Sequence, residues 1–469
     1  MANIGSRIER IPDNKYNRKL LVISGFGNTF DSMDIAMVAF VLPSIIGLWN
    51  LSSGQAGLLG SSVLIGYFFG ALLSGYLGDK IGRKKVIMYT LVIYCLATLV
   101  SAFAGQWEHF FWLRIIAGFG TGGESAILAP YLAELIASKY RGKYIGALTG
   151  FHSFGYVAAA VLAYFIIPMS DNGWRLAIFI TALPIFLVIY WRRVLPESPR
   201  WLESAGRLQE ADQEMKKMEK SVEKALGEKL PAPAATTASP AAQQKGSFFA
   251  LWKRAFVKKT IMLWVLWFSV IFSYYGFFTW LPTLLYNEGF EISKSFGFSI
   301  LIYLAQIPGY FSAAFLNDMI GRKKVIVSYL GLASVSAFFL SQADASTAIL
   351  IAGFFTSLFM VGAMAGMYTY TPEQYPTIIR STGTGSASAF GRIGGLLAPI
   401  YIGFMYPILG FIGVFLMTTG VLFIGMISTL LLGDETKSKP LDEIADEKID
   451  VDTKEEVDSI ESSSEWKVN

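Results

Sequence analysis

The sequence predicts an all-α membrane protein in which twelve transmembrane helices form two pseudo-symmetric six-helix bundles. Three observations support this: the composition, the recurrence of apolar stretches and an internal repeat. Of 469 residues, 53% are hydrophobic and only 16% are charged, so a soluble globular fold would leave too much apolar surface exposed. Apolar stretches of about 20 residues, the length that crosses a bilayer, recur from Leu20 to Leu432.

The two halves of the chain are copies of one unit. Leu42-Pro43 recurs 239 residues later as Leu281-Pro282, and Gly82-Arg83-Lys84-Lys85 recurs as Gly321-Arg322-Lys323-Lys324. The same offset relates Asp79 to Asp318, Glu134 to Glu373, Arg141 to Arg380 and Pro168 to Pro407. A constant offset without a gap indicates a duplicated structural unit.

Each half is expected to cross the membrane six times. The predicted spans of the first half are 20–48, 55–77, 85–104, 108–137, 143–167 and 174–195. Those of the second half are 259–286, 293–319, 324–341, 346–370, 382–406 and 409–432. Interfacial aromatic residues blur the ends, so the count is better defined than the boundaries. The bundles therefore occupy 20–195 and 259–433.

Lys and Arg concentrate on one side of the predicted membrane. They precede the first span and fill the second and fourth connections, at Arg7, Arg10, Lys15, Arg18, Lys19, Lys80, Arg83, Lys84, Lys85, Lys139, Arg141 and Lys143. The opposite connections carry few charges. Basic loops resist translocation, so both termini are expected in the cytoplasm of a cell-membrane protein.

Three segments lie outside the predicted bundles: the N-terminus 1–19, a linker 196–258 and an acidic tail 434–469. The linker begins with a polar, helix-forming run and continues with an Ala/Pro stretch from Pro231 to Pro240, which is typical of a disordered tether. Residues 248–259 alternate apolar and basic side chains, which suits a helix at the inner membrane surface. The tail is interpreted as a solubilising extension.

The composition argues against several other classes of protein. Cys95 is the only cysteine, so neither a disulfide framework nor a thiolate metal cluster can form. His109 and His152 are the only histidines and do not support a metal site. Gly118-Phe-Gly-Thr-Gly-Gly123 fits the dinucleotide pattern, but it lies within a span and follows no strand. We therefore predict no metal, no cofactor, no nucleic-acid partner and no enzymatic activity.

Small residues within the spans are expected to let helices pack closely. This applies to the glycines of 118–123 and to Gly142, Gly146 and Gly150, which recur at every fourth position. The copies of the latter three are Ser381, Gly385 and Ala389, which are also small.

The loop Gly75-Tyr-Leu-Gly-Asp-Lys-Ile-Gly-Arg-Lys-Lys85 and its copy Asn317-Asp-Met-Ile-Gly-Arg-Lys-Lys324 resemble the signature loop of the major facilitator superfamily. Arg114 with Gly118, Gly120 and Gly122 resembles the superfamily's fourth-span pattern. Pro196-Glu-Ser-Pro-Arg-Trp-Leu202 is similar to a motif of the sugar-porter branch. The resemblance covers nearly all of the predicted spans and implies a membrane transporter with the major facilitator fold.

The same resemblance implies a cytoplasmic gate made of salt bridges that break and re-form in each cycle. Its residues in the first half would be Asp79, Arg83, Glu134, Arg141, Glu197 and Arg200. Their counterparts in the second half would be Asp318, Arg322, Glu373 and Arg380. Each such pair is expected to be only modestly stabilising.

Charged residues inside the spans break the symmetry of the repeat. Asp31, Asp34, Arg114, Glu124 and Arg392 correspond to Val270, Ser273, Gly353, Ala363 and Ser153 in the other copy. An ionised side chain near the bilayer centre costs about 3 kcal/mol, so these groups should face a wet cavity, a partner or both.

Asp31 and Asp34 share a helix face, and two carboxylates so close cannot both ionise freely at neutral pH. We expect proton coupling by Asp31, Asp34 and Glu124, with Asp34 as the first candidate and Asp31 the more structural of the pair. Arg114 should lie at a depth from which it can bridge to Asp34. The alternative is that these are static pairs that orient the helices.

Phe30-Asp-Ser-Met-Asp34, together with Gly391-Arg-Ile-Gly-Gly395 and Pro399, resembles the nicotinate permease and synaptic-vesicle-transporter-like branch, and more loosely the aromatic-acid:proton symporters. The resemblance implies proton-coupled symport in which Arg392 or Arg114 meets a substrate carboxylate. A guanidinium offers a planar fork that suits a carboxylate, so an organic anion is favoured. Further substrate-binding candidates are Tyr67, His152, Tyr274, Tyr275 and Gln306.

Other functions stay open at the level of sequence. Sugar symport or passive sugar facilitation fits the Pro-Glu-Ser-Pro-Arg motif, but the seventh span lacks the Gln-rich pattern of sugar porters. A nutrient receptor derived from a transporter is a further alternative, although such proteins commonly carry a longer cytoplasmic extension. The sequence also leaves open sodium coupling and antiport, and we expect a monomer.

Overall fold

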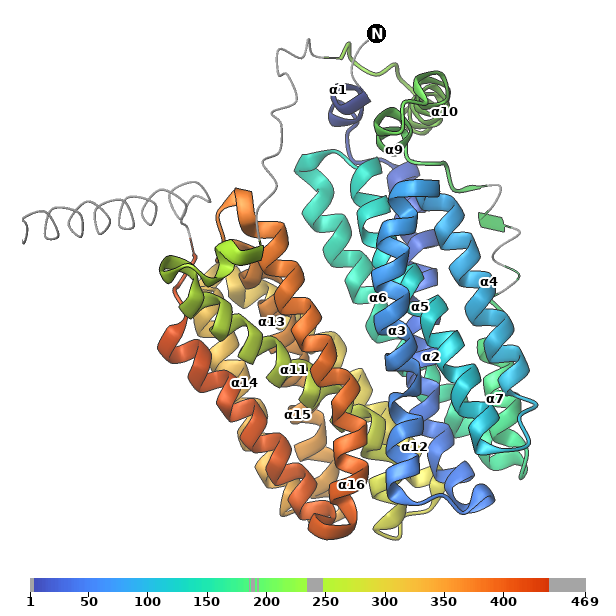
Figure 1. Ribbon diagram of the computed structural model, residues 1–469, viewed down its shortest axis with the longest axis vertical. Helices are drawn as coiled ribbons and strands as arrows, with labels where there is room; N and C mark the ends of the chain where they lie inside the picture. The colour runs from blue at the N-terminus through green and yellow to red at the C-terminus, as the bar shows by residue number, and fades with distance from the viewer. Residues whose placement is uncertain (1–3, 185, 187–189, 192–193, 234–247, 438–469) are drawn as a thin grey trace, which may run out of the picture. The chain divides into compact units, whose positions relative to one another are not determined.

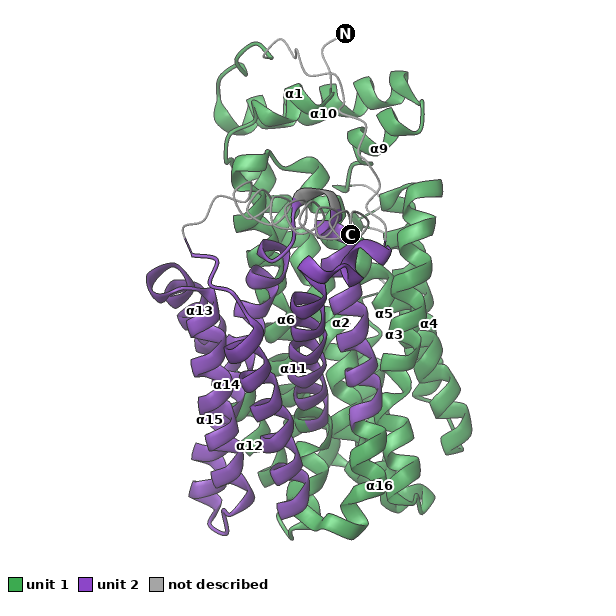
Figure 2. Cartoon of the chain, turned by 60° about the vertical axis from the view of Figure 1, so that its left-hand side comes forward, with its two compact units in different colours: residues 1–239, 277–304, 399–411 green, residues 240–276, 305–398, 412–469 purple. Residues whose placement is uncertain are grey.

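The structure is a computed structural model that describes residues 4–184, 186, 190–191, 194–233 and 248–437. Every regular element in this part of the chain is helical (Figure 1). The chain divides into two compact units, coloured in Figure 2. Unit 1 comprises Met1–Ser239, Phe277–Leu304 and Pro399–Phe411, and unit 2 comprises Pro240–Gly276, Ala305–Ala398 and Ile412–Asn469.

Unit 1 contains most of the first half of the chain. Its helices are α1 (Ile4–Glu9), α2 (Lys15–Trp49), α3 (Ser53–Ile81), α4 (Arg83–Ser101), α5 (Trp107–Leu135), α6 (Ser138–Ile166), η1 (Ile167–Met169), α7 (Gly173–Thr181), α9 (Pro199–Ser204), α10 (Leu208–Leu226) and α12 (Ile292–Leu304). Unit 2 contains η2 (Phe248–Trp252), α13 (Gln306–Ile320), α14 (Arg322–Ser341) and α15 (Ser346–Glu373). Helices α11 (Arg254–Asn287) and α16 (Thr377–Leu432) contribute residues to both units.

The helices account for the predicted spans. Within the described residues, nine helical segments are long and apolar enough to cross a membrane. Helix α16 covers the two last predicted spans, which Gly410 separates with a positive φ of 63°. Helix α5 covers the fourth span, and the sixth begins in α7 and continues into residues that are only partly described. The all-α membrane fold is therefore confirmed.

One predicted span is less regular than the sequence suggests. The predicted span 293–319 is broken at Ala305, between α12 and α13. Pro308 lies in the first turn of α13, four residues after Leu304, the last residue of α12. Proline removes a backbone donor and clashes with the preceding turn, so it disfavours a continuous helix at this point. In unit 1, Trp280 Nε1 donates to the carbonyl oxygen of Pro399 at 3.0 Å, which ties the end of α11 to α16.

Glycines bring α3 and α5 into backbone contact in unit 1. A Cβ on Gly118 would overlap the carbonyl oxygen of Val63, and one on Gly122 would overlap that of Tyr67. The close packing predicted for residues 118–123 is confirmed. The same prediction for Gly142, Gly146 and Gly150 of α6 is wrong, because a Cβ at any of them would meet no atom within 4 Å. These three glycines face open space, so their small size does not serve packing between helices here.

The segments outside the spans differ in how far the structure describes them. The polar run of the linker forms α9 and α10, as predicted, and α10 buries Ala211, Met215, Met218 and Val222 on one face. The apolar and basic segment 248–259 does not form one separate helix: its first five residues form the 3-10 helix η2, and the residues from Arg254 onward belong to α11. Most of the Ala/Pro stretch and of the acidic tail lies outside the described residues.

Candidate functional site

A buried polar cluster occupies the interior of unit 1. It contains Asp31 and Asp34 of α2, Arg114 and Glu124 of α5, Thr98 of α4 and Thr181 of α7. None of these side chains is more than 1% exposed. Two of the four charged residues form an ion pair and two do not, so they differ in chemistry.

Asp34 and Arg114 form the ion pair that the sequence predicted. Arg114 Nη1 lies 3.1 Å from Asp34 Oδ1, and Thr98 Oγ1 donates to the same oxygen at 3.0 Å. Arg114 Nη2 donates to Thr98 Oγ1 at 2.6 Å, and Thr181 Oγ1 lies 3.4 Å from Asp34 Oδ1. Opposite charges in contact offset part of each other's desolvation cost, so this pair is stable in its ionised form.

Asp31 and Glu124 form no ion pair with any described residue. None of their four carboxyl oxygens has a hydrogen-bond partner within the described part of the chain. Glu124 lies against Gly27 of α2, where a Cβ would come within 2.5 Å of its Oε1. An isolated buried carboxylate is costly, so each of these groups is more stable as the neutral acid. The cluster thus combines one ionised pair with two acids suited to carry a proton.

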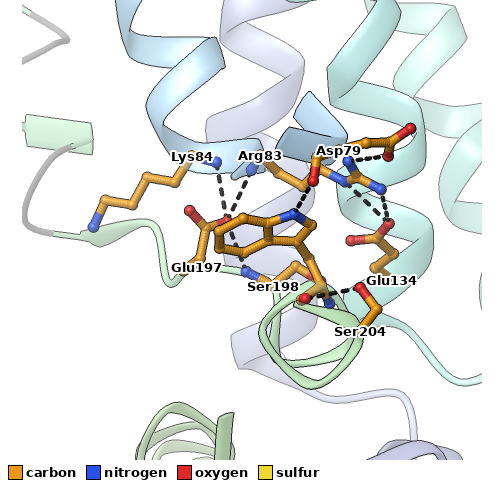
Figure 3. A network of polar contacts seen from close by, with 8 residues as sticks. Asp79, Arg83, Lys84, Glu134, Glu197, Ser198 and Ser204 are labelled. Atoms are coloured by element: carbon orange, nitrogen blue, oxygen red, sulfur yellow. Dashed lines mark hydrogen bonds and ion pairs between the residues drawn. The ribbon is translucent and has the colours of Figure 1, made fainter. Parts of the chain in front are cut away.

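A second polar network lies at the cytoplasmic end predicted for unit 1, where the chain turns from α3 into α4 (Figure 3). Arg83 Nη1 contacts Asp79 at 2.6 Å and its Nη2 contacts Glu134 at 2.9 Å. Glu197 accepts from the backbone N–H groups of Arg83 and Lys84, both at 3.1 Å. Burial raises the pKa of Glu197, although these backbone hydrogen bonds oppose the rise.

Gly82 explains why the chain can turn at this network. Its φ of 107° is a conformation that L side chains rarely adopt, and a Cβ there would come within 2.5 Å of Glu197 Oε2. Trp201 of α9 donates its indole N–H to the carbonyl oxygen of Asp79 at 2.8 Å. The sugar-porter-like motif of 196–202 is therefore bound directly to the signature loop.

Unit 2 repeats this arrangement with its own residues. Arg322 lies 3.5 Å from Asp318 and 3.3 Å from Glu373. Its backbone N–H donates to Glu435 at 2.9 Å, and Gly321 has a φ of 101°. The repeat found in the sequence is thus a repeat of hydrogen bonds. Each network includes residues from two or more helices of its own unit.

Arg141 and Arg380 occupy equivalent places in the two networks. The Nε of each donates at 3.0 Å to a carbonyl oxygen eight residues earlier, Ala133 in one case and Pro372 in the other. Arg141 additionally lies 3.8 Å from Glu9, and Arg200 lies 3.0 Å from the same carboxylate. Glu9 was not predicted as a site residue. Its only signal is that it is an acid within a basic N-terminal segment.

The remaining predicted residues divide between the units. Tyr67 of α3 and His152 of α6 belong to unit 1, where the Tyr67 hydroxyl contacts Ser125 Oγ at 2.8 Å. The other predicted residues belong to unit 2, namely Tyr274, Tyr275, Gln306 and Arg392. Gln306 is 1% exposed, and its side-chain nitrogen has no hydrogen-bond partner within the described residues. Tyr274 and Tyr275 have perpendicular rings 5.3 Å apart, and Arg392 is half-buried.

Aromatic residues of α11 pack against the segment of α16 that carries Arg392. This packing was not predicted from the sequence. Gly391 packs against Trp267, Gly394 against Phe268 and Gly395 against Tyr275. The rings of Trp264 and Phe390 are stacked with centroids 4.7 Å apart. The glycines of the Gly391-Arg-Ile-Gly-Gly395 motif therefore let α16 lie directly on an aromatic helix. The available signal was the close spacing of Gly391, Gly394 and Gly395 and the aromatic composition of α11.

The described residues contain no group of three or more His, Cys, Asp or Glu side chains that could hold a metal ion. The polar cluster of unit 1 offers carboxyl and guanidinium groups, and the segment around Arg392 in unit 2 offers a guanidinium beside aromatic rings. Carboxyl groups can bind and release protons, and a guanidinium can bind a carboxylate.

Comparisons with known proteins show the family to which the chain belongs. Residues 15–447 match the sugar (and other) transporter family. The niacin transporter NiaP of Acinetobacter baylyi is 39% identical over 94% of this chain and 99% of its own length. The putative niacin/nicotinamide transporter NiaP of Bacillus subtilis is 36% identical over 91% of this chain and 98% of its own length.

Among solved structures, the inward open conformation of the xylose transporter XylE from E. coli superposes with a TM-score of 0.72. It covers 92% of this chain and 99% of that one at 19% sequence identity. At this identity the likeness establishes a shared fold alone.

Proposed function

This chain belongs to the sugar (and other) transporter family of the major facilitator superfamily, and from that premise we propose that it takes up a small organic anion together with protons. The best candidate class is an aromatic or heterocyclic carboxylate such as nicotinate. Uptake would proceed by alternating access, with a proton and the solute sharing the same cycle. The protein would act as a monomer in the cell membrane with both termini in the cytoplasm.

The observation that supports proton coupling is a pair of buried acids, Asp31 and Glu124, whose carboxyl oxygens have no hydrogen-bond partner among the described residues. A passive carrier has no need of titratable groups there, and each such group is costly when ionised inside a span. Asp31 and Glu124 lie in the same cluster as the Asp34–Arg114 pair. In the proposed mechanism Asp31 and Glu124 carry the protons, and Asp34 holds Arg114 in place through their ion pair.

The choice of substrate class rests on unit 2 and on the relatives. A planar aromatic acid offers a ring that can stack on Trp or Phe and a carboxylate that a guanidinium can bind with two parallel hydrogen bonds. Arg392 lies on the part of α16 that packs against the aromatic residues of α11. Two relatives with more than 35% identity carry niacin in their names.

Alternating access would use the two cytoplasmic networks. Each pair in them is partly exposed, so it contributes at most about 1 kcal/mol and can exchange partners. Asp79, Arg83, Glu134, Arg141, Glu197 and Arg200 would form the gate on unit 1, and Asp318, Arg322, Glu373 and Arg380 the gate on unit 2.

Uptake into proteoliposomes under an imposed inward proton gradient tests the proposal. Labelled nicotinate, benzoate and glucose would be compared for wild type, Asp31→Asn, Glu124→Gln and a matched control, Glu108→Gln, an exposed acid at the other end of α5. We expect gradient-driven accumulation of nicotinate by wild type and by the control. The two variants should lose accumulation but keep counterflow, since exchange requires no net proton movement.

Other outcomes would point elsewhere. Accumulation that survives in both variants would contradict proton coupling by these acids. Accumulation of glucose without accumulation of either carboxylate would support the sugar alternative. Equilibration of nicotinate that does not respond to the gradient would indicate a facilitator.

A further inference from the structure

The N-terminal helix of this chain docks on the linker helices within unit 1. Ile4, Ile8 and Ile11 are at most 5% exposed. They belong to one apolar cluster with Trp201 and Leu202 of α9 and with Ala211, Met215, Met218 and Val222 of α10. This burial favours a docked N-terminal segment over a free one.

Ion pairs fix the same helix in one register on α10. Arg7 Nη1 contacts Asp212 at 2.7 Å and Arg7 Nη2 contacts Glu219 at 2.6 Å. Arg10 also contacts Glu219. The hydrogen bonds of Arg7 and Arg10 lower the pKa of Glu219, although burial alone would raise it. The docked helix therefore presents the next acid, Glu9, in a defined position.

Glu9 contacts the beginning of α6 and two arginines of the predicted gate. Its carboxylate accepts from the backbone N–H of Ser138 at 2.8 Å and from the hydroxyl of Ser138 at 2.7 Å. Arg200 lies 3.0 Å away and Arg141 lies 3.8 Å away. A carboxylate at a helix N-terminus is further stabilised by the free N–H groups of the first turn.

Among the described residues, the second copy of the repeat shows no carboxylate in the place of Glu9. Arg380 repeats the backbone hydrogen bond of Arg141, but its Nη2 is buried and has no hydrogen-bond partner among the described residues. Within the described part of the second copy, no carboxylate contacts this guanidinium. In unit 1 the N-terminal segment supplies one.

We propose that residues 4–13 form an N-terminal clip in which Glu9 serves as the counter-ion of Arg141 and Arg200. The clip keeps both arginines within unit 1 and so disfavours the conformation in which they pair with other carboxylates. Release of Glu9 makes the two guanidinium groups available to close the cytoplasmic gate. The inference rests on the proposed function, because the gate role of the two arginines comes from it.

A cysteine-labelling experiment on the full chain tests the clip. Gly146→Cys serves as the reporter, because Gly146 faces open space and Cys95, the only native cysteine, is buried. A membrane-impermeant thiol reagent would be applied to the cytoplasmic side. Glu9→Gln should slow labelling by about two- to five-fold, the range expected for loss of a partly exposed ion pair.

Two further variants make the result specific. Arg7→Gln loosens α1 from α10 without touching Arg141 or Arg200, so it should slow labelling in the same direction. Glu210→Gln removes an exposed acid that pairs with Arg207 and should leave labelling unchanged. Unchanged labelling in Glu9→Gln would overturn the proposal. So would slowing by Glu9→Gln that Arg7→Gln does not reproduce.

The labelling needs no substrate, so its outcome is distinguishable from that of the uptake assay. A labelling shift without carboxylate uptake would keep the clip and overturn the choice of substrate. Carboxylate uptake with unchanged labelling would overturn the clip alone.

Discussion

Asp34→Asn provides the most direct test of how the buried cluster is organised. The substitution keeps the size of the side chain and an oxygen that can accept from Thr98, but it leaves the guanidinium of Arg114 buried without a counter-ion. Removing one partner of a buried ion pair typically costs about 3 to 5 kcal/mol. Because the remaining oxygen still accepts a hydrogen bond, we expect a loss of about 3 kcal/mol in the free energy of unfolding.

Asp31→Asn is the matched control, one turn earlier on the same helix. Asp31 has no guanidinium partner, so replacing a neutral acid by a neutral amide should cost about 1 kcal/mol, the scale of one altered buried polar group. The double variant Asp34→Asn with Arg114→Leu should recover part of the loss, because no unpaired charge remains.

Reversible unfolding of the purified protein in mixed micelles measures these differences. A destabilisation of Asp31→Asn as large as that of Asp34→Asn would refute the division of the cluster into one ionised pair and two neutral acids. So would a double variant that is less stable than Asp34→Asn alone.

Four other predictions address the rest of the molecule. Asp79→Asn removes the 2.6 Å contact of Arg83 and should favour the inward-open state, seen as faster cytoplasmic labelling of Gly146→Cys. Gly118→Ala forces a Cβ onto the carbonyl oxygen of Val63 and should lower the free energy of unfolding by about 1 to 3 kcal/mol in the same assay. Gly146→Ala meets open space and should leave that free energy unchanged or raise it by up to about 1 kcal/mol. Arg392→Lys replaces a planar guanidinium with a point charge and should weaken carboxylate binding about tenfold in an equilibrium binding assay. The control Lys437→Arg, at an exposed site, should leave this affinity unchanged. The hydrogen bond from Tyr144 lowers the pKa of Asp13 to about 2, so the stabilisation that Asp13 gives the clip is complete above about pH 4 and is lost as the pH falls toward 2. Glu9 and Glu219 also have lowered pKa values in the docked clip and contribute to the same acid transition. A fluorophore on residues 4–13 should report detachment as the pH falls, and Asp13→Asn should shift the transition to higher pH and make it shallower.

The sequence predicted the features that follow from helix geometry and from duplication. Arg114 and Asp34 meet because a constant rise per residue places them at similar depths in α5 and α2. The networks around Arg83 and Arg322 match because the same residues recur at the same spacing. Both predictions needed distances along helices only, and these are encoded locally.

Features that depend on what a surface faces could not be predicted in the same way. A row of glycines shows that space exists on one side of a helix, but not whether another helix fills it, and Gly142, Gly146 and Gly150 face open space. Glu9 contacts Arg200 across 191 residues of chain, and no local pattern specifies such a contact. Arg114 could have paired with Asp31 or with Asp34, and only the three-dimensional arrangement shows that it contacts Asp34.

The glycine contact between α3 and α5 has a mechanical consequence. The backbones of α3 and α5 touch without side chains between them, so a change of rotamer cannot separate or shift them. The two helices should therefore move together as one rigid body. Arg114 and Glu124 belong to α5 and so to this rigid pair, whereas Asp31 and Asp34 belong to α2. When Asp31 or Asp34 changes its charge, the force acts between α2 and the rigid pair of α3 and α5. Because that pair does not deform, α2 and the helices that pack on it should be the ones that move.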